Sequence, residues 1–278
     1  MSGRYDDAAC VRRQVQRQNG AIRERVADWI ATEVPIALHY NGQSHVVMMA
    51  TPSDLDDFAL GFSLSEGIIG TASELESIRT RELLEGIVVD ITVPANRAEA
   101  IATRQRNMTG QSSCGLCGTQ SLADAVRQPR SAGQGATLSV EALHRALKTL
   151  PNQQPVNALT GATHAAAWID GDGEIVLVRE DVGRHNALDK LIGAMTRDRI
   201  DFGCGAVVIS SRASYEMVQK AATVGISIVV AISAATALAI QMAESTNVTL
   251  IGYARADRHV IYTHPQRVQS IAVASAKP

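Results

Sequence analysis

The first part of the chain has two short apolar segments around a turn, followed by a longer apolar run, which is typical of a β-hairpin followed by a helix. Residues 34–40 and 45–50 are mostly apolar and read as two short strands. The Asn41-Gly42 pair between them suits the left-handed positions of a tight hairpin turn. Residues 51–65 then begin with a proline and acidic residues before an apolar run, which predicts a helix.

The remainder of this half has weaker patterns. Residues 87–93 read as a strand and residues 97–106 as a helix. The first 25 residues are polar and basic with little periodicity, so we expect a flexible tail at 1–25. A stretch rich in Pro, Gly and Ser at 128–135 marks an internal boundary. We therefore expect a small α+β lobe over residues 26–128.

Beyond that boundary, short apolar strands alternate regularly with helices. The expected strands are 164–169, 175–179, 206–210, 226–232 and 248–252, and the expected helices are 139–150, 186–196, 214–224 and 236–244. Such alternation predicts a largely parallel sheet with helices on its faces. The fold class is therefore α/β, with a second domain over 136–278.

Composition narrows the class of protein. The chain has 278 residues, a net charge of −2 and 4 cysteines, which does not indicate a nucleic-acid-binding, disordered or disulfide-rich secreted protein. Residues 221–242 carry no charged side chain and are long enough to cross a bilayer. Their internal Gly, Ser and Thr residues instead favour a helix end, a buried strand and a new helix. We expect a cytoplasmic protein without a membrane segment.

Candidate chemistry begins with a pair of thiols. Cys114 and Cys117 lie two residues apart in the glycine-flanked segment Ser-Ser-Cys-Gly-Leu-Cys-Gly, ahead of a helical stretch. Unpaired amide groups at a helix start favour a thiolate. A structural zinc site needs further ligands, and neither the two remaining cysteines nor the histidines have suitable spacing. A redox pair fits the spacing, but such pairs usually lie beside an early βαβ unit.

A second group of candidates follows the predicted parallel strands. In an open sheet of this type, ligands bind beyond the carboxyl ends of the strands. Arginines come soon after several strands, and Ser214 opens a helix. Together these residues favour a site for a phosphate-bearing ligand, although each alone could be a cap or a solvated charge. The arginines are Arg184, Arg212, Arg255 and Arg258, with His185 beside the first.

Several motifs resemble the formate dehydrogenase accessory sulfurtransferases, the FdhD family. They include the cysteine segment, Thr-Gly-Ala-Thr-His-Ala-Ala at 160–166, and Glu-Asp-Val-Gly-Arg-His-Asn-Ala-Leu-Asp-Lys at 180–190. Ser-Arg-Ala-Ser-Tyr-Glu-Met at 211–217 follows in the same order, and the resemblance extends from about residue 29 to about residue 267. Many members have Gly where this chain has Ser211.

The resemblance implies a cytosolic sulfur carrier with a cytidine deaminase-like three-layer core and no catalytic zinc or structural metal. Such a carrier takes persulfide sulfur from a cysteine desulfurase and transfers it to the bis-molybdopterin guanine dinucleotide cofactor of formate dehydrogenase. It also implies Cys114 as the persulfide carrier, with Cys117 auxiliary, and a homodimer. The stretch implied to bind the molybdenum cofactor comprises Tyr253, Ala254, Arg255, Ala256, Asp257 and Arg258.

Two other functions stay open at this point. A dithiol oxidoreductase would cycle a Cys114–Cys117 disulfide without a desulfurase. A cofactor-binding escort would use the thiols only as ligands to molybdenum. The sequence does not decide whether Cys117 is essential.

Overall fold

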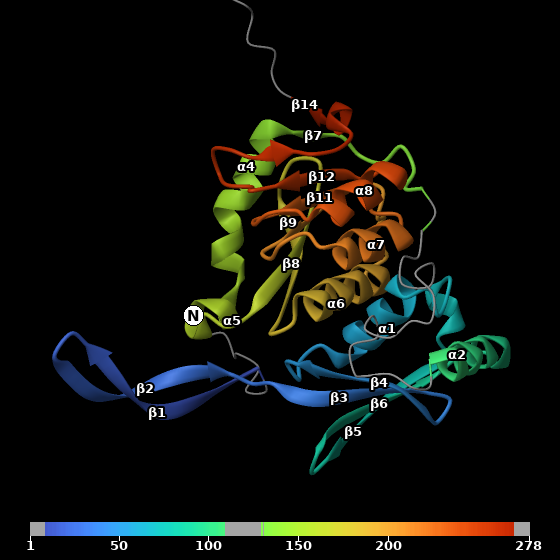
Figure 1. Cartoon of the computed structure of the whole chain (residues 1–278), viewed down its shortest axis with the longest axis horizontal. Coiled ribbons are helices and arrows are strands. Elements are labelled where there is room, and N and C mark those ends of the chain that lie inside the picture. The colour runs from blue at the N-terminus through green and yellow to red at the C-terminus, as the bar shows by residue number, and fades with distance from the viewer. Residues whose placement is uncertain (1–8, 109–128, 130, 270–278) are drawn as a thin grey trace, which may run out of the picture.

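The computed structural model describes residues 9–108, 129 and 131–269 of the chain. Figure 1 shows two bodies of secondary structure packed together, with a long two-stranded ribbon projecting to one side. The larger body contains a six-stranded sheet and the smaller a four-stranded sheet. The predicted α/β class is confirmed, and the division into domains at 26–128 and 136–278 stays a prediction.

The ribbon corrects the expectation of a flexible tail over residues 10–25, while residues 1–8 lie outside the described residues. Strands β1 (Cys10–Asn19) and β2 (Ile22–Ala31) pair along their whole length in antiparallel register. The turn between them contains Gly20 at a φ of 58°, a conformation that glycine adopts at little cost. Periodicity was weak because most ribbon side chains are exposed on both faces, so burial does not impose alternation.

The four-stranded sheet has the order β4-β3-β6-β5. Asn41 and Gly42 take φ values of 49° and 80° between β3 and β4, so the predicted hairpin is confirmed. The predicted helix and the strand at 87–93 are confirmed as α1 and β6, whereas β5 was missed because its residues are mostly exposed. The elements here are β3 (Val34–Tyr40), β4 (Gln43–Ala50), α1 (Leu55–Ser65), β5 (Ser77–Leu83), β6 (Gly86–Thr92) and α2 (Ala95–Met108).

The six-stranded sheet has the order β13-β12-β11-β10-β8-β9. Only the β10–β11 and β11–β12 pairings are parallel, while β8 runs antiparallel to both neighbours. Because β8 lies between β9 and β10 and is antiparallel to both, β9 runs in the same direction as β10, β11 and β12. The strands are β8 (His164–Ile169), β9 (Ile175–Asp181), β10 (Ala206–Ile209), β11 (Ile228–Ala231), β12 (Thr249–Gly252) and β13 (Val260–Ile261).

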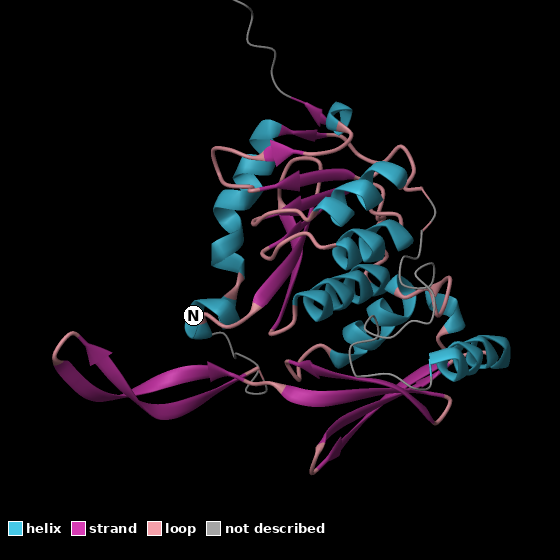
Figure 2. Cartoon of the chain, viewed as in Figure 1, coloured by secondary structure: helices cyan, strands magenta, loops and turns pink. Residues whose placement is uncertain are grey.

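Helices cover both faces of this sheet and make three layers (Figure 2). Alternate strand residues divide between two cores: Val207 and Val229 face α6, α7 and α8, whereas Val208 and Val230 face α4. Among the described helices none has the length and apolar character to span a bilayer, and the uncharged run at 221–242 crosses α7, β11 and α8. The helices are α4 (Val140–Thr149), α5 (Pro155–Thr160), α6 (Arg184–Arg197), α7 (Tyr215–Thr223) and α8 (Ala237–Ser245), and β7 (Leu138–Ser139) pairs with β14 (Val268–Gln269).

Two glycines allow α1 and α6 to pack with their backbones in contact. A Cβ atom on Gly61 would lie 1.7 Å from the carbonyl oxygen of Asp189, and one on Gly193 would lie 1.9 Å from that of Asp57. Both obstacles are backbone atoms, so a side-chain rotation cannot relieve either clash. This crossing joins the smaller body to the larger one and fixes the position of α6.

We expect Gly61→Ala to lower the free energy of unfolding by about 3 kcal/mol, at the upper end of overpacking effects, because the methyl group forces the helices apart. Urea denaturation followed by circular dichroism measures the change. The matched control is Gly171→Ala, since Gly171 has no heavy atom within 4 Å of its built Cβ position. A Gly61→Ala protein as stable as the control would show that the crossing tolerates separation.

Candidate functional site

The carboxyl ends of β9, β10, β11 and β12 meet at one edge of the six-stranded sheet. Short backbone hydrogen bonds continue the sheet past the strands: Tyr253 N donates to Ser233 O at 3.0 Å and Ala254 N donates to Ala231 O at 3.1 Å. Ala213 and Ala235 form a further parallel bridge. The loops that carry the predicted site residues are therefore held side by side.

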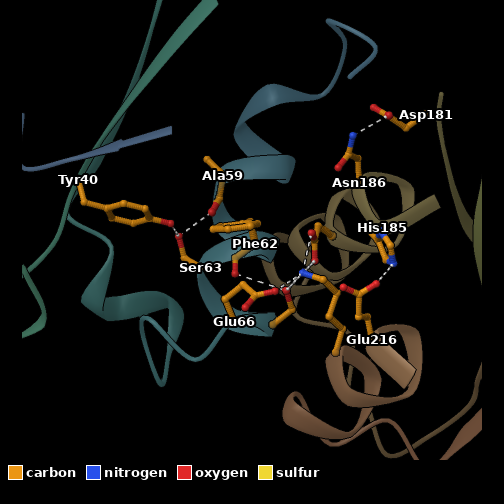
Figure 3. A network of polar contacts seen from close by, with 12 residues as sticks. Tyr40, Ala59, Phe62, Ser63, Glu66, Asp181, His185, Asn186 and Glu216 are labelled. Atoms are coloured by element: carbon orange, nitrogen blue, oxygen red, sulfur yellow. Dashed lines mark hydrogen bonds and ion pairs between the residues drawn. The ribbon is translucent and has the colours of Figure 1, made fainter. Parts of the chain in front are cut away.

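The loop after β9 is fixed by the buried carboxylate of Asp181. Its Oδ1 accepts from Gly183 N at 2.7 Å and from Asn186 Nδ2 at 3.0 Å, the second contact being visible in Figure 3. Its Oδ2 accepts from Thr51 N at 3.0 Å and lies 2.7 Å from Lys190 Nζ. Four donors surround this carboxylate. A structural role of the motif at 180–190 is therefore to fix where α6 begins.

These hydrogen bonds place Arg184 and His185 in the first turn of α6, which begins two residues earlier than predicted. Arg184 Nε is buried and has no hydrogen-bond partner among the described residues. Ser214 precedes α7, yet its buried Oγ caps nothing and is also without a partner there. Buried polar atoms without partners are rare in folded proteins, so two of them at adjacent helix starts indicate a place for a ligand.

The charges around these atoms are well defined. His185 Nε2 lies 2.7 Å from Glu216 Oε2 (Figure 3). The contact with His185 outweighs partial burial and holds the pKa of Glu216 below its usual value, so this carboxylate is ionised at neutral pH. Burial, and then the charge of Arg184, lower the pKa of His164, so its imidazole is neutral. Glu216 and His164 were quoted in sequence motifs, but no pattern assigned them to this cluster.

The loop at 253–258 lies at the other end of the same edge. Tyr253 is 53 % exposed and has a φ of 49°. Arg255 N donates to Arg258 O at 2.7 Å, and Arg255 Nη1 donates to the carbonyl oxygens of Ala254 and Ile232. Arg255 thus holds its own loop against the end of β11, which is a role the sequence did not predict.

The topology separates the predicted arginines into two groups. Arg184 follows β9 and Arg255 follows β12, and the sheet order places four strand spacings between those strands. At about 4.8 Å for each spacing, the two ends are about 19 Å apart. The prediction that the four arginines serve a site for a phosphate-bearing ligand stays a prediction, but this spacing separates Arg184 from Arg255 along the edge. Candidate basic residues therefore stand at two places along the edge.

Beneath the loops, a buried lysine links both bodies of the protein. Lys220 Nζ of α7 lies 3.0 Å from Asp189 Oδ2 and 2.8 Å from Glu66 Oε1, and it stands over the ring of Phe62. Burial alone would lower the pKa of Lys220, but the two carboxylates outweigh it and raise that pKa. Full burial raises the pKa of Asp189, yet Ser65 Oγ and Lys220 both donate to it, and we take the pair as ionised.

The two predicted sulfur carriers, Cys114 and Cys117, lie outside the described residues. A third thiol, Cys204, is exposed, and its Sγ lies 3.1 Å from Asp201 Oδ2. The hydrogen bond to this carboxylate raises the pKa of Cys204, so little thiolate is present at neutral pH. Within the described residues, no cluster of three or more His, Cys, Asp or Glu side chains could hold a metal ion.

We expect Lys220→Met to lower the free energy of unfolding by about 3 to 5 kcal/mol, because Asp189 would be left buried without its counter-charge. Chemical denaturation at neutral pH measures the loss. Lys148→Met is the matched control, since Lys148 is exposed near the end of α4 and should change stability by less than about 0.5 kcal/mol. Equal stability of the two variants would contradict the ionised pair.

Comparisons with known proteins agree with the resemblance in the sequence. The sequence model of the FdhD/NarQ family matches residues 31–269. A relative from Xanthomonas euvesicatoria, named sulfur carrier protein FdhD, is 52 % identical over 266 residues, covering 96 % of this chain and 94 % of its own. A protein of the same name from Cupriavidus necator is 49 % identical over 242 residues, covering 87 % of this chain and 84 % of its own.

One solved structure supports the fold. The crystal structure of a candidate formate dehydrogenase accessory protein from Desulfotalea psychrophila aligns with a TM-score of 0.72 and 22 % identity, covering 94 % of this chain and 100 % of that one. At this identity the likeness concerns the fold alone. The match to the family model covers most of the chain and the relatives are about half identical to it, so this chain belongs to the FdhD/NarQ family.

Proposed function

We propose that this protein is a cytoplasmic sulfurtransferase that carries sulfur as a persulfide on Cys114. The donor is a cysteine desulfurase, and the acceptor substrate is the molybdenum bis-molybdopterin guanine dinucleotide of formate dehydrogenase. The observation that carries the proposal is the family membership over residues 31–269, a range that contains both cysteines and every loop of the site. The proposed active form is a homodimer.

Loading follows ordinary thiol–persulfide exchange. The thiolate of Cys114 attacks the outer sulfur of the donor's persulfide, a new S–S bond forms on Cys114, and the donor's S–S bond breaks. The donor cysteine leaves as a thiolate, so atoms and charge balance without a further reactant. Cys204 does not compete, because Asp201 keeps its thiol protonated.

Delivery of the outer sulfur as sulfide requires two electrons. The thiolate of Cys117 supplies them when it attacks the inner sulfur of the Cys114 persulfide. The Cys114–Cys117 disulfide forms, and the outer sulfur leaves as sulfide to the acceptor. An external dithiol then reduces the disulfide before the next cycle. Cys117 is in this account auxiliary to loading and important for turnover.

The strand-end loops are suited to hold an extended, anionic acceptor. Arg184 Nε and Ser214 Oγ have no hydrogen-bond partner within the described part of the chain at one end, and the exposed Arg258 lies in the loop at the other end. A bis-guanine dinucleotide carries well separated phosphates, which agrees with two anion-binding places about 19 Å apart. These contacts would position the acceptor, whereas the cysteines carry the sulfur.

Intact-mass and peptide mass spectrometry test the carrier. After incubation with a cysteine desulfurase, pyridoxal phosphate and cysteine, we expect one reductant-labile sulfur on Cys114 of the wild type. Cys114→Ala should lose the adduct, while Cys117→Ala should keep it. Cys204→Ala is the matched control and should load like the wild type. A Cys114–Cys117 disulfide without an adduct would favour the dithiol oxidoreductase, and the absence of both would favour a cofactor escort.

Calorimetric titration with guanosine diphosphate tests the acceptor site. We expect Arg184→Met to weaken binding at least about tenfold, because a charge-assisted contact to phosphate is lost. The matched control is Arg145→Met on α4, whose exposed guanidinium donates to Asp172 O at 2.7 Å on the other side of the sheet. Unchanged affinity in Arg184→Met, or equal loss in both variants, would contradict this site.

A further inference from the structure

Strand β9 forms one edge of the six-stranded sheet, where β8 alone lies beside it among the described strands. Ser210 N donates to Ala165 O at 2.9 Å and Ala165 N donates to Ser210 Oγ at 2.9 Å, so the backbone groups of Ala165 point toward β10. Glu180 is paired with Ala165, and alternation along antiparallel strands therefore turns the backbone N–H and C=O groups of Glu180 and Val178 to the outer side of β9. These groups have no strand partner in the described part of the chain.

The outer side of β9 lacks the protection that sheet edges usually have. Outward charged side chains or prolines commonly prevent an exposed edge from pairing with a further strand. The charged residues at the end of β9 are held within the molecule, since Arg179 lies 2.8 Å from Asp57. Glu180 accepts from backbone N–H groups of α5, and Asp181 is fully buried. Val176 is 48 % exposed, so the strand presents an aliphatic side chain to the solvent and its edge is open to a further strand.

A groove of about 480 Å³ lies beside this edge, and its size is within the usual range for a binding pocket. One wall is formed by β9 from Ile175 to Glu180. The other walls are the end of the 3-10 helix η2 (Leu150–Gln153) with the start of α5, and the root of the ribbon at Ala9 and Cys10. Figure 1 shows α5 close to this root. The outer side of β9 thus faces an open space, which we call the β9 groove.

Aliphatic side chains make up much of the groove wall. A strand that joins a sheet edge gains affinity from main-chain hydrogen bonds and specificity from pockets that receive alternate side chains. A groove with unpaired strand groups along an aliphatic wall therefore suits an extended peptide with aliphatic residues at every second position. The aliphatic lining residues are Pro155, Val156, Ile175, Val176, Leu177 and Val178.

Charge is unbalanced at one end of the β9 groove. The turn that leads into β9 carries the carboxylates of Asp170, Asp172 and Glu174. Arg145 lies 3.6 Å from Glu174 and offsets one of these three charges. At the opposite end, acidic and basic side chains pair with each other. An occupant with basic residues beside the turn complements this charge, and in the more stable antiparallel pairing that end is the carboxyl end of the occupant.

The first eight residues of the chain lead to the groove at Ala9, but their sequence does not suit it. Gly3, Asp6 and Asp7 are residue types that strands disfavour. Arg4 is the single basic side chain of this segment and is outnumbered by the two aspartates, so the segment does not complement the acidic turn. The groove therefore fits a segment of another protein better than the terminus of its own chain.

We propose that the β9 groove binds an extended segment of a partner protein, which adds to the six-stranded sheet as an antiparallel strand beside β9. The segment has aliphatic residues at alternate positions and basic residues at its carboxyl end. Because β9 runs directly into the loop that begins α6, the amino end of the bound segment lies beside Asp181, next to the candidate site. This docking role goes beyond the proposed function and does not require sulfur transfer.

Calorimetric titration of the full chain with a synthetic peptide tests the groove. The probe is acetyl-Thr-Val-Thr-Val-Thr-Lys-Lys-amide, which has the alternation and the basic carboxyl end that the groove requires. A control peptide has the same side chains but N-methylated backbone nitrogens, and it should bind at least about tenfold more weakly because its main-chain donors are lost. Hydrogen exchange gives a second measurement, since the probe should slow exchange at the amides of Val178 and Glu180.

A pair of matched substitutions locates the binding. Val176→Lys places an ammonium group in the β9 groove and should weaken binding of the basic probe at least about tenfold, because like charges then meet. Leu238→Lys makes the same change of charge on α8, where Leu238 is 44 % exposed and does not line the groove, and should leave the affinity unchanged. Circular dichroism melting checks that both variants fold.

Three results would overturn the proposal. They are equal binding of the probe and its N-methylated form, equal affinity of Val176→Lys and Leu238→Lys, and binding only to a chain that lacks residues 2–8. The last result would show that the chain's own amino-terminal segment occupies the groove. Sulfur loading of Cys114 is measured separately by mass, so the docking role and the proposed function can each fail alone.

Discussion

The backbone contact between α1 and α6 is the constraint on which the arrangement of the molecule depends. Gly61 and Gly193 let two helices from different parts of the sequence approach until carbonyl groups take the place of side chains. Because α6 begins with Arg184 and His185, the depth of this contact sets where those side chains emerge at the sheet edge. The placement of these candidate site residues therefore depends on how closely α1 and α6 pack.

Buried ion pairs also hold α6 in its position. Asp189 contributes its carbonyl oxygen to the glycine contact and its carboxylate to Lys220, while the neighbouring Lys190 binds Asp181 at 2.7 Å. Each charge has a specific counter-charge, so a shift of α6 would leave several charges unpaired at once. Such an arrangement specifies one position more strongly than apolar packing does.

The sequence predicted the buried elements and missed the exposed ones, for a physical reason. The Asn41-Gly42 hairpin was predicted from its turn pair, and the strands of the second half were predicted because full burial makes them short apolar runs. β1, β2 and β5 have mostly exposed side chains, so their period was faint. The antiparallel course of β8 also escaped notice, since alternation of strands and helices does not reveal the direction of each strand.

For the candidate site, the sequence identified the loops but not their geometry. Residues such as Arg184 and Ser214 were found because they follow strands, whereas the distance between the ends depends on the strand order. His185 pairs with Glu216, but the two residues belong to separate motifs, and neither motif alone predicts the pairing. Arg255 was taken as an anion ligand, although its side chain binds backbone carbonyls.

The separation of the two ends of the sheet edge has a kinetic consequence. A ligand held at both ends must release one end before the other, and the released end can rebind while the first contact persists. Dissociation then becomes a two-step process that is slower than loss from either end alone. A long residence time of this kind would keep an extended acceptor in place while a separate sulfur donor arrives and leaves.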